Sequence, residues 1–241
     1  MKLIYWNRGK DKGVKMRINK LLSNHGICSR TEANRLIEEN RIIVNGHLCT
    51  PGQWVEEEDI ILIDNEPIPV KDRIYIALNK PVGITCTAEK TVDSNIISFM
   101  NYPEYIFPVG RLDKASQGLI LMTNDGELAN KILESENEHE KEYIVTVNKS
   151  FDECFMKGMS EGVKISGVTT RLCKVTRVCD DTFSIILTQG LNKQIRRMSS
   201  AFGYKVVRLE RIRIINIKIQ GIEVGMWRDL TDSEVMDLQN K

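Results

Sequence analysis

The feature that most constrains how this chain can fold is a series of β-rich segments between residues 75 and 219, interrupted by few helices. A parallel sheet needs a long crossover between neighbouring strands, whereas antiparallel strands can follow one another directly. The pattern therefore predicts an α+β fold with a large, mainly antiparallel mixed sheet and flanking helices. Strands are expected at 75–79, 118–123, 142–147, 168–178, 182–189 and 205–219, with shorter helices near 93–101, 126–136, 151–159 and 193–202.

A smaller α/β module is predicted ahead of this sheet. Ser29 precedes Glu32 by three residues, which is the spacing of a capping box and predicts a helix over 29–39. Asn45-Gly46 follows an apolar run and predicts a tight hairpin. A polar, proline-bearing stretch then leads to the sheet. The predicted divisions are a basic extension (1–15), the module (16–66), a linker (67–74) and a larger domain (75–241).

Three helix starts in the larger domain carry local signals. Ser150 with Glu153, and Thr231 with Glu234, repeat the capping-box spacing. Asn192 stands immediately before the helix expected at 193–202 and is predicted to cap it.

Charge is nearly balanced over the whole chain but not along it. The chain has 34 Lys and Arg against 33 Asp and Glu, a net charge of +1. An anion-binding surface must therefore come from local clustering. Between 193 and 213 a single acid, Glu210, stands among seven cations: Lys193, Arg196, Arg197, Lys205, Arg208, Arg211 and Arg213. This concentration favours a nucleic-acid site over the alternative, a solvated charged helix face.

Several kinds of chemistry lack their sequence signals. The six cysteines include no C-x-x-C pair and the three histidines are scattered, so we expect reduced thiols and no metal site. Dinucleotide and P-loop fingerprints are missing, and we expect no cofactor. No apolar run is long enough to span a bilayer and the chain starts without a signal-peptide pattern, so we expect a cytoplasmic protein with no membrane partner.

A carboxylate is the best remaining candidate for a reactive group. Asp113 lies between Arg111 and Lys114 in a polar stretch that leads into a buried strand. Nearby cations favour the ionised carboxylate, which suits a base or a nucleophile. The alternative is a solvated turn with surface ion pairs. Tyr143 opens the strand at 142–147, where a tyrosine usually packs in the core but can also stack on an unpaired base.

These residues bring the chain close to a known family. G-R-L-D-x-x-S-x-G-L-x-L-x-T-N-D-G at 110–126, K-E-Y at 141–143 and G-L-N-x-Q-I-R-R-M at 190–198 resemble the motifs of the RsuA/RluA group of RNA pseudouridine synthases. The stretch from Arg17 resembles an S4 RNA-binding domain, which identifies the module at 16–66. The resemblance spans about 17–235 and is closest to the RluF type, with the RsuA, RluB and RluE types as near relatives.

The resemblance implies a role for five residues, without metal or cofactor. Asp113 matches the catalytic aspartate, which acts on a uridine flipped out of its helix, and Arg196 the arginine that pairs with it. Tyr143 matches the tyrosine that stacks on the target base, and Ile195 the apolar residue beneath that base. Arg111 matches the arginine that fills the space left by flipping. Whether Asp113 adds to the sugar or removes a proton from C2′ stays open.

The remaining predicted contacts are with RNA phosphates. The basic segment supplies Lys193, Arg197, Arg208 and Arg211, and the module's helix and its end supply Arg30, Asn34, Arg35 and Arg41. The implied partner is a stem-loop of large-subunit ribosomal RNA, with transfer RNA as a further candidate, and we expect a monomer. The alternatives are another ribosomal target, a non-catalytic ribosome-assembly factor, or a carboxylate-based hydrolase.

Overall fold

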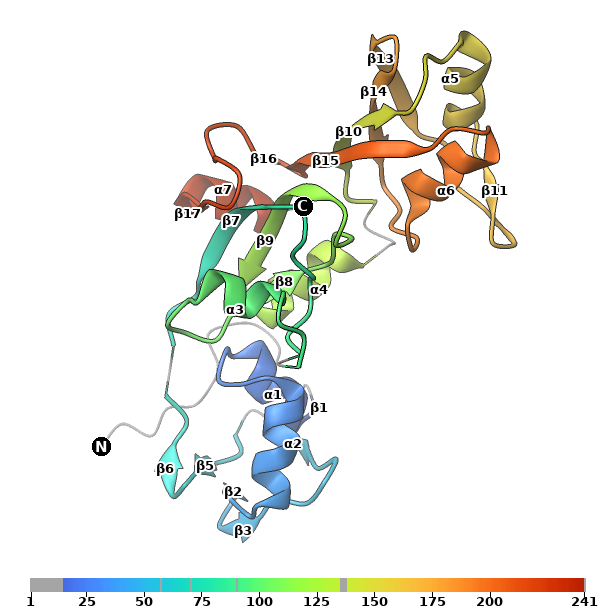
Figure 1. Ribbon diagram of the computed structural model, residues 1–241. Helices are drawn as coiled ribbons and strands as arrows, with labels where there is room; N and C mark the ends of the chain where they lie inside the picture. The colour runs from blue at the N-terminus through green and yellow to red at the C-terminus, as the bar shows by residue number, and fades with distance from the viewer. Residues whose placement is uncertain (1–14, 57, 70, 90, 135–137, 241) are drawn as a thin grey trace. The chain divides into compact units, whose positions relative to one another are not determined.

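The computed structural model describes residues 15–240 apart from 57, 70, 90 and 135–137. The predicted basic extension therefore lies almost wholly outside the described residues. The chain forms two compact units. Figure 1 shows the ribbon coloured from blue at the N-terminus to red at the C-terminus. The first unit contains residues up to Ile74 together with Tyr102–Ile106 and Thr123–Glu127, and the second contains the rest. In the described part of the chain, no helix is long and apolar enough to cross a membrane.

The first unit holds two helices against short antiparallel strands. Its four-stranded sheet has the order β3-β2-β5-β6, and β1 pairs separately with β4. The apolar faces of both helices pack on the sheet through Leu21, Leu36, Ile42 and their neighbours. The elements are β1 (Met16–Arg17), α1 (Ile18–Asn24), α2 (Arg30–Glu38), β2 (Ile42–Val44), β3 (His47–Leu48), β4 (Trp54–Val55), β5 (Ile61–Ile63) and β6 (Glu66–Pro67).

Local sequence signals explain two features of this unit. The Ser29 hydroxyl accepts a hydrogen bond from Glu32 N at 3.1 Å and so caps α2 as predicted. The Glu32 carboxylate bonds with Arg35 rather than with the cap backbone, so only half of the capping box forms. Asn45 and Gly46 both have positive φ and join β2 to β3, which confirms the predicted hairpin.

The second part of the chain is built on one large sheet. Its elements are β7 (Tyr75–Lys80), α3 (Ile96–Met100), β8 (Phe107–Val109), β9 (Gln117–Thr123), α4 (Gly126–Leu133), β10 (Lys141–Val147), α5 (Glu153–Ser160), β11 (Lys164–Ile165), β12 (Val168–Thr169), β13 (Lys174–Cys179), β14 (Thr182–Leu187), α6 (Gln194–Ala201), β15 (Val206–Ile214), β16 (Ile217–Lys218), β17 (Trp227–Asp229) and α7 (Asp232–Gln239).

This sheet confirms the predicted fold class. Its main order is β13-β14-β10-β15-β9-β7-β17, with β16 paired to β15 and β8 to β9. The ladder β13-β14-β10-β15 is antiparallel throughout, and so is the pair β7-β17. Strands β15 and β9 run parallel, which makes the sheet mixed.

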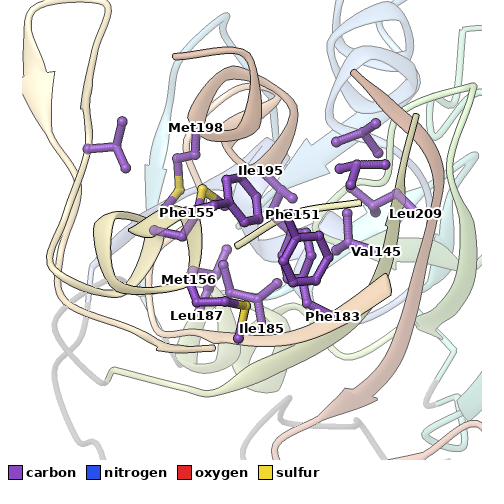
Figure 2. Packing of buried hydrophobic residues seen from close by; sticks show 14 of the residues in the cluster. Val145, Phe151, Phe155, Met156, Phe183, Ile185, Leu187, Ile195, Met198 and Leu209 are labelled. Carbon is purple, nitrogen blue, oxygen red and sulfur yellow. The ribbon is translucent and has the colours of Figure 1, made fainter. Parts of the chain in front are cut away.

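One apolar cluster fixes α5 and α6 on the β10-β14-β15 part of the sheet (Figure 2). The Phe155 ring lies 5.1 Å from Phe151 and 5.4 Å from Phe183, centroid to centroid. Ile195 and Met198 reach the same cluster from α6. This packing sets the position of α6, which carries the predicted arginine of the catalytic site. A second cluster, containing Leu119, Ile132 and Ile214, supports β9 and the C-terminal part of β15.

Some predicted element ends are wrong. Asn192 does not cap α6: Lys193 occupies that position in a left-handed conformation without a side-chain cap. Ser150 does not cap α5, because the carboxylate of Asp152 accepts the bond from Phe155 N. Thr231 and Glu234 form the complete capping box that was predicted.

Two predicted strands are interrupted. The segment expected as one strand at 205–219 turns back at Ile215, whose φ is +54°, and so divides into β15 and β16. The segment at 168–178 divides into β12 and β13. Strands β8 and β17 were not predicted from the sequence at all, because each has only three residues.

Candidate active site

The loop that carries Asp113 connects β8 to β9 and is held by the segment that follows β7. Gly83 N donates to Lys114 O at 2.8 Å. On the other side of Asp113, Leu112 N donates to the Cys86 sulfur at 3.3 Å. Residues 112 and 114 are thus both tethered to the same segment, which fixes the backbone of Asp113 between them.

Arg196 of α6 approaches this loop from a distant part of the chain. Its Nη2 donates to Ala115 O and to Ser116 Oγ, each at 3.1 Å, and its Nη1 donates to Val206 O at 3.1 Å. Its Nε lies 3.9 Å from Asp113 Oδ2, an ion pair whose side chains are only 23% and 32% exposed. The guanidinium therefore binds the loop backbone and faces the carboxylate at the same time.

Ser116 completes the loop. Its side chain is buried, and its N–H donates to Asp113 O at 3.0 Å in a tight turn. The predicted flanking cations, Arg111 and Lys114, are exposed. Among the described residues the ion pair of Asp113 is with Arg196 and not with either neighbour in sequence.

Tyr143 and Ile195 both contact the apolar cluster that supports α6. Tyr143 stands opposite Ile185 of β14 and Arg211 of β15 in the ladder, and its half-buried ring packs against the cluster of Figure 2. Ile195 belongs to that cluster and is 4% exposed. Both residues thus belong to the packed region that also positions Arg196. Their roles toward a target base stay predictions.

Arg211 is the clearest departure from the sequence-based prediction. It was predicted to contact phosphate, but its side chain is 3% exposed and its Nε donates to Leu119 O at 2.6 Å. A surface contact with the RNA backbone is therefore wrong for this residue. The close approach of β15 to β9 requires Gly118: a Cβ there would lie 2.3 Å from the Arg211 carbonyl oxygen, and its φ is +114°.

The other predicted phosphate contacts of this unit are exposed. Lys193 stands at the start of α6. Arg197 donates to Ser166 Oγ at 2.8 Å and Asn192 Oδ1 at 3.0 Å, both neutral partners, so its charge remains available to an anion. Arg208 is paired with Glu210 at 2.7 Å, which reduces its net attraction for phosphate.

The predicted RNA contacts of the first unit also divide into residues without an acidic partner in the described part of the chain and arginines that are paired with acids. Arg30 is exposed at the first turn of α2, and Asn34 accepts a hydrogen bond from Asn19. Arg35 is paired with Glu32 and Glu39, and Arg41 with Glu39 and Asp64. Two of the three arginines that were predicted to hold phosphate, Arg35 and Arg41, are therefore balanced by acids on the same surface.

Sequence reasoning missed the residues that hold the loop: Gly83, Cys86, Ser116 and Lys80. Lys80 is 0% exposed and donates to Pro81 O at 2.8 Å and Ile84 O at 2.9 Å, which shapes the segment that tethers Asp113. A lysine that ends an apolar run and precedes a proline was the available signal. Among the described residues no group of three or more His, Cys, Asp or Glu side chains could hold a metal ion.

Comparison with known proteins identifies the families to which the two parts of the chain are similar. Residues 74–201 match the RNA pseudouridylate synthase family, and residues 16–61 match the S4 domain. The dual-specificity RNA pseudouridine synthase RluF of Escherichia coli is 51% identical over 226 residues, 92% of this chain and 78% of that protein. The ribosomal large subunit pseudouridine synthase B of Bacillus subtilis is 32% identical, over 92% and 95% of the two chains.

A solved structure agrees with the fold. The crystal structure of a pseudouridylate synthase superposes with a TM-score of 0.69 and 28% identity, covering 92% of this chain and 99% of that one. The chain belongs to the family of RNA pseudouridine synthases that carry an S4 domain and is similar to the RluF type. It is an isomerase that acts on RNA.

Proposed function

We propose that this enzyme converts one specific uridine in a stem-loop of large-subunit ribosomal RNA to pseudouridine, as a cytoplasmic monomer. The observation that carries the proposal is its similarity, over nearly the whole length of both chains, to a relative named as a ribosomal large subunit synthase. The more similar E. coli relative is named as having dual specificity. We therefore include a second RNA substrate in the proposal, and transfer RNA is the first candidate to test.

In this proposal Asp113 acts on the sugar of the flipped uridine. The ion pair with Arg196 supports this role, because a nearby guanidinium favours the ionised carboxylate that either route to the detached base requires. Three hydrogen bonds fix Arg196 itself, so it holds Asp113 in place as well as balancing its charge.

Tyr143 and Ile195 are proposed to bind the base. A half-buried ring beside an apolar cluster offers a flat surface on which a pyrimidine can stack. Arg111, which is exposed in the same loop as Asp113, is proposed to fill the gap in the RNA helix. Extracting the base costs a few kcal/mol, least in a loop or bulge, which favours a stem-loop substrate.

The other basic residues are proposed to hold the RNA backbone. Lys193 and Arg197 are the best supported, because no carboxylate is paired with either in the part of the chain described by the structure. Arg30 and Asn34 are proposed to serve the same purpose in the S4 domain. Arg35, Arg41 and Arg208 would first have to exchange acidic partners for phosphate, so we expect smaller contributions from them.

The test is a pseudouridine map of ribosomal RNA from cells that lack the protein, made by carbodiimide modification and primer extension. We expect one large-subunit site to disappear and to return when the wild-type chain, but not Asp113→Asn, is supplied. Purified chain with ribosomal and transfer RNA transcripts tests dual specificity directly. Release of free uracil would instead indicate a hydrolase, and an unchanged map with intact RNA binding would indicate a non-catalytic binding protein.

A further inference from the structure

Three cations are enclosed in the catalytic unit without an acidic partner. Arg211 is 3% exposed, Lys80 is 0% exposed, and Lys141 is partly buried at the start of β10. Among the described residues none of them has a carboxylate within 4.0 Å, since their nitrogens bind backbone carbonyl oxygens instead. Burying a charge is costly unless a counter-charge compensates it. This group therefore has a net positive charge that the protein leaves uncompensated.

Arg211 is the member that pairs across the sheet with a residue of the proposed reaction. It stands directly opposite Tyr143 in the β10-β15 ladder, and cross-strand partners project their side chains to the same face of a sheet. Its Nε donates a hydrogen bond to Leu119 O at 2.6 Å. Its Nη2 is buried and has no hydrogen-bond partner among the described residues. A buried donor without a partner costs free energy, which an incoming acceptor would recover.

Electrostatic interactions connect Arg211 to both lysines, and Asp113 to Lys80. Burial lowers the pKa of Lys80, and Arg211 acts in the same direction, while Cys86 and Asp113 oppose it. Burial, with a smaller effect of Arg211, lowers the pKa of Lys141 to about 8. Arg211 is thus close enough to act on both lysines, and Asp113 is close enough to act on one of them.

Building on the synthase activity proposed above, we propose that Arg211, supported by Lys141 and Lys80, stabilises the detached uracil anion. In this step the C1′–N1 bond breaks, and its electron pair passes to N1 and spreads over the two carbonyl oxygens of the base. Nη2 of Arg211 donates to one of these oxygens. Asp113 serves the sugar by either route, and the base leaves as an anion in both.

The anion is then consumed. The base turns, C5 forms the new bond to C1′, the proton on C5 is lost and N1 takes up a proton, so that the product is an isomer of the substrate. Negative charge exists on the base only between the two bond changes. Fixed donors aimed at such a transient charge in a site that excludes water accelerate a reaction more than contacts that the substrate already makes.

The alternative is that Arg211 is structural and only joins β15 to β9. The two roles predict different effects of the leaving base on the rate that is lost when Arg211 is replaced. Fluorine at C5 withdraws electrons and stabilises the uracil anion without help from the protein. An RNA with 5-fluorouridine at the target position should therefore depend less on Arg211 than the same RNA with uridine.

The experiment measures single-turnover cleavage of the C1′–N1 bond in both RNAs with wild-type enzyme and Arg211→Met. We expect the variant to cleave the uridine RNA about a hundredfold more slowly, as when one oxyanion donor is lost, but the 5-fluorouridine RNA only about tenfold more slowly. RNA affinity should stay within about threefold, because the buried Arg211 makes no contact with the RNA backbone and acts only on the detached base. Equal slowing of both RNAs, or none, overturns the proposal.

Two further variants keep the test decisive. Arg177→Met is the matched control, because this guanidinium also donates to a backbone carbonyl, Phe151 O, but is paired with Glu153. For Arg177→Met, the cleavage rate of the 5-fluorouridine RNA divided by that of the uridine RNA should equal the wild-type ratio. Should Arg211→Met not fold, Lys141→Met removes a neighbouring cation and should raise this ratio about threefold. An unchanged ratio in Lys141→Met also overturns the proposal. Wild-type enzyme that makes no pseudouridine would instead refute the proposed function.

Discussion

Replacing Arg196 with lysine tests whether geometry or charge makes this residue important. The guanidinium makes three hydrogen bonds at 3.1 Å, two to the Asp113 loop and one to Val206 O, and keeps its Nε 3.9 Å from the carboxylate. A lysine has one nitrogen on a flexible stem and cannot bind both segments as the planar guanidinium does. The positive charge stays, but the connection between the loop and β15 is lost.

The magnitude follows from these contacts. Losing two hydrogen bonds, at about 1 kcal/mol each, should lower the free energy of unfolding by about 2 kcal/mol. For a chain of this size that corresponds to about 4–8 °C in Tm. A shift of about 1 Å in a reacting group can cost on the order of a hundredfold in rate, or about 2.7 kcal/mol of barrier.

The assay compares Arg196→Lys with wild type in single-turnover pseudouridine formation, RNA binding and thermal unfolding. We expect the chemical step to slow about a hundredfold, while RNA affinity changes less than about threefold because Lys193 and Arg197 remain. Arg177→Lys is the control for a general effect of exchanging arginine for lysine, since its guanidinium also binds a backbone carbonyl and a carboxylate.

The refuting result is equally definite. If RNA affinity falls at least tenfold while the bound complex reacts at the wild-type rate, Arg196 is a phosphate contact. If the rate and the Tm are both unchanged, the three hydrogen bonds do not position the Asp113 loop.

Three further outcomes are expected. Asp113→Asn should lower the rate at least a thousandfold with RNA affinity kept, because an amide is neither base nor nucleophile; activity within tenfold of wild type would contradict the catalytic role. Gly118→Ala should cost about 2–4 kcal/mol of stability in urea unfolding, because its Cβ would meet backbone at 2.3 Å, whereas Gly221→Ala, with φ +81° but no atom within 4 Å, should cost about 1. Burial lowers the pKa of His25 to about 4, so the folded state resists protonation and stability falls as pH drops from about 6.5 to 4. Allowing for partial exposure, we expect about 1–2 kcal/mol of this loss to disappear in His25→Gln but to persist in the exposed control His47→Gln.

Features fixed by neighbouring residues could be predicted from the sequence. The cap at Ser29, the full capping box at Thr231 and the Asn45-Gly46 hairpin each depend on two to four consecutive residues. The longer strands of the sheet could be predicted because the apolar alternation of β14 or the apolar run of β9 is a property of one segment. The wrong caps at Asn192 and Ser150 show the limit, because each helix begins one or two positions later, at Lys193 without a side-chain cap and at Asp152 with one.

Arg211 shows how a charge count can mislead. It was grouped with six other cations because their sequence positions are close, and four of the seven, Arg211 among them, were assigned to phosphate contacts. Alternation within the strand carries the better information: Leu209 is buried, and a residue two positions later projects to the same face. That face is the one on which Tyr143 lies, so alternation pointed Arg211 toward the interior of the site.

The arrangement around Asp113 depends on contacts that no local pattern contains. Arg196 binds Ala115 across 81 residues of sequence, and Cys86 binds Leu112 N across 26. The motif at 110–126 gives the residue types of the loop, but their purpose appears only when these partners are present. Gly118 is a glycine because β15 approaches it, and that approach places Arg211 directly beside β9, the strand that follows the loop. The residue types of the motif are therefore determined by packing against neighbouring strands and helices as well as by the reaction. For this reason the motif identifies the site from sequence, although it does not give the geometry of the site.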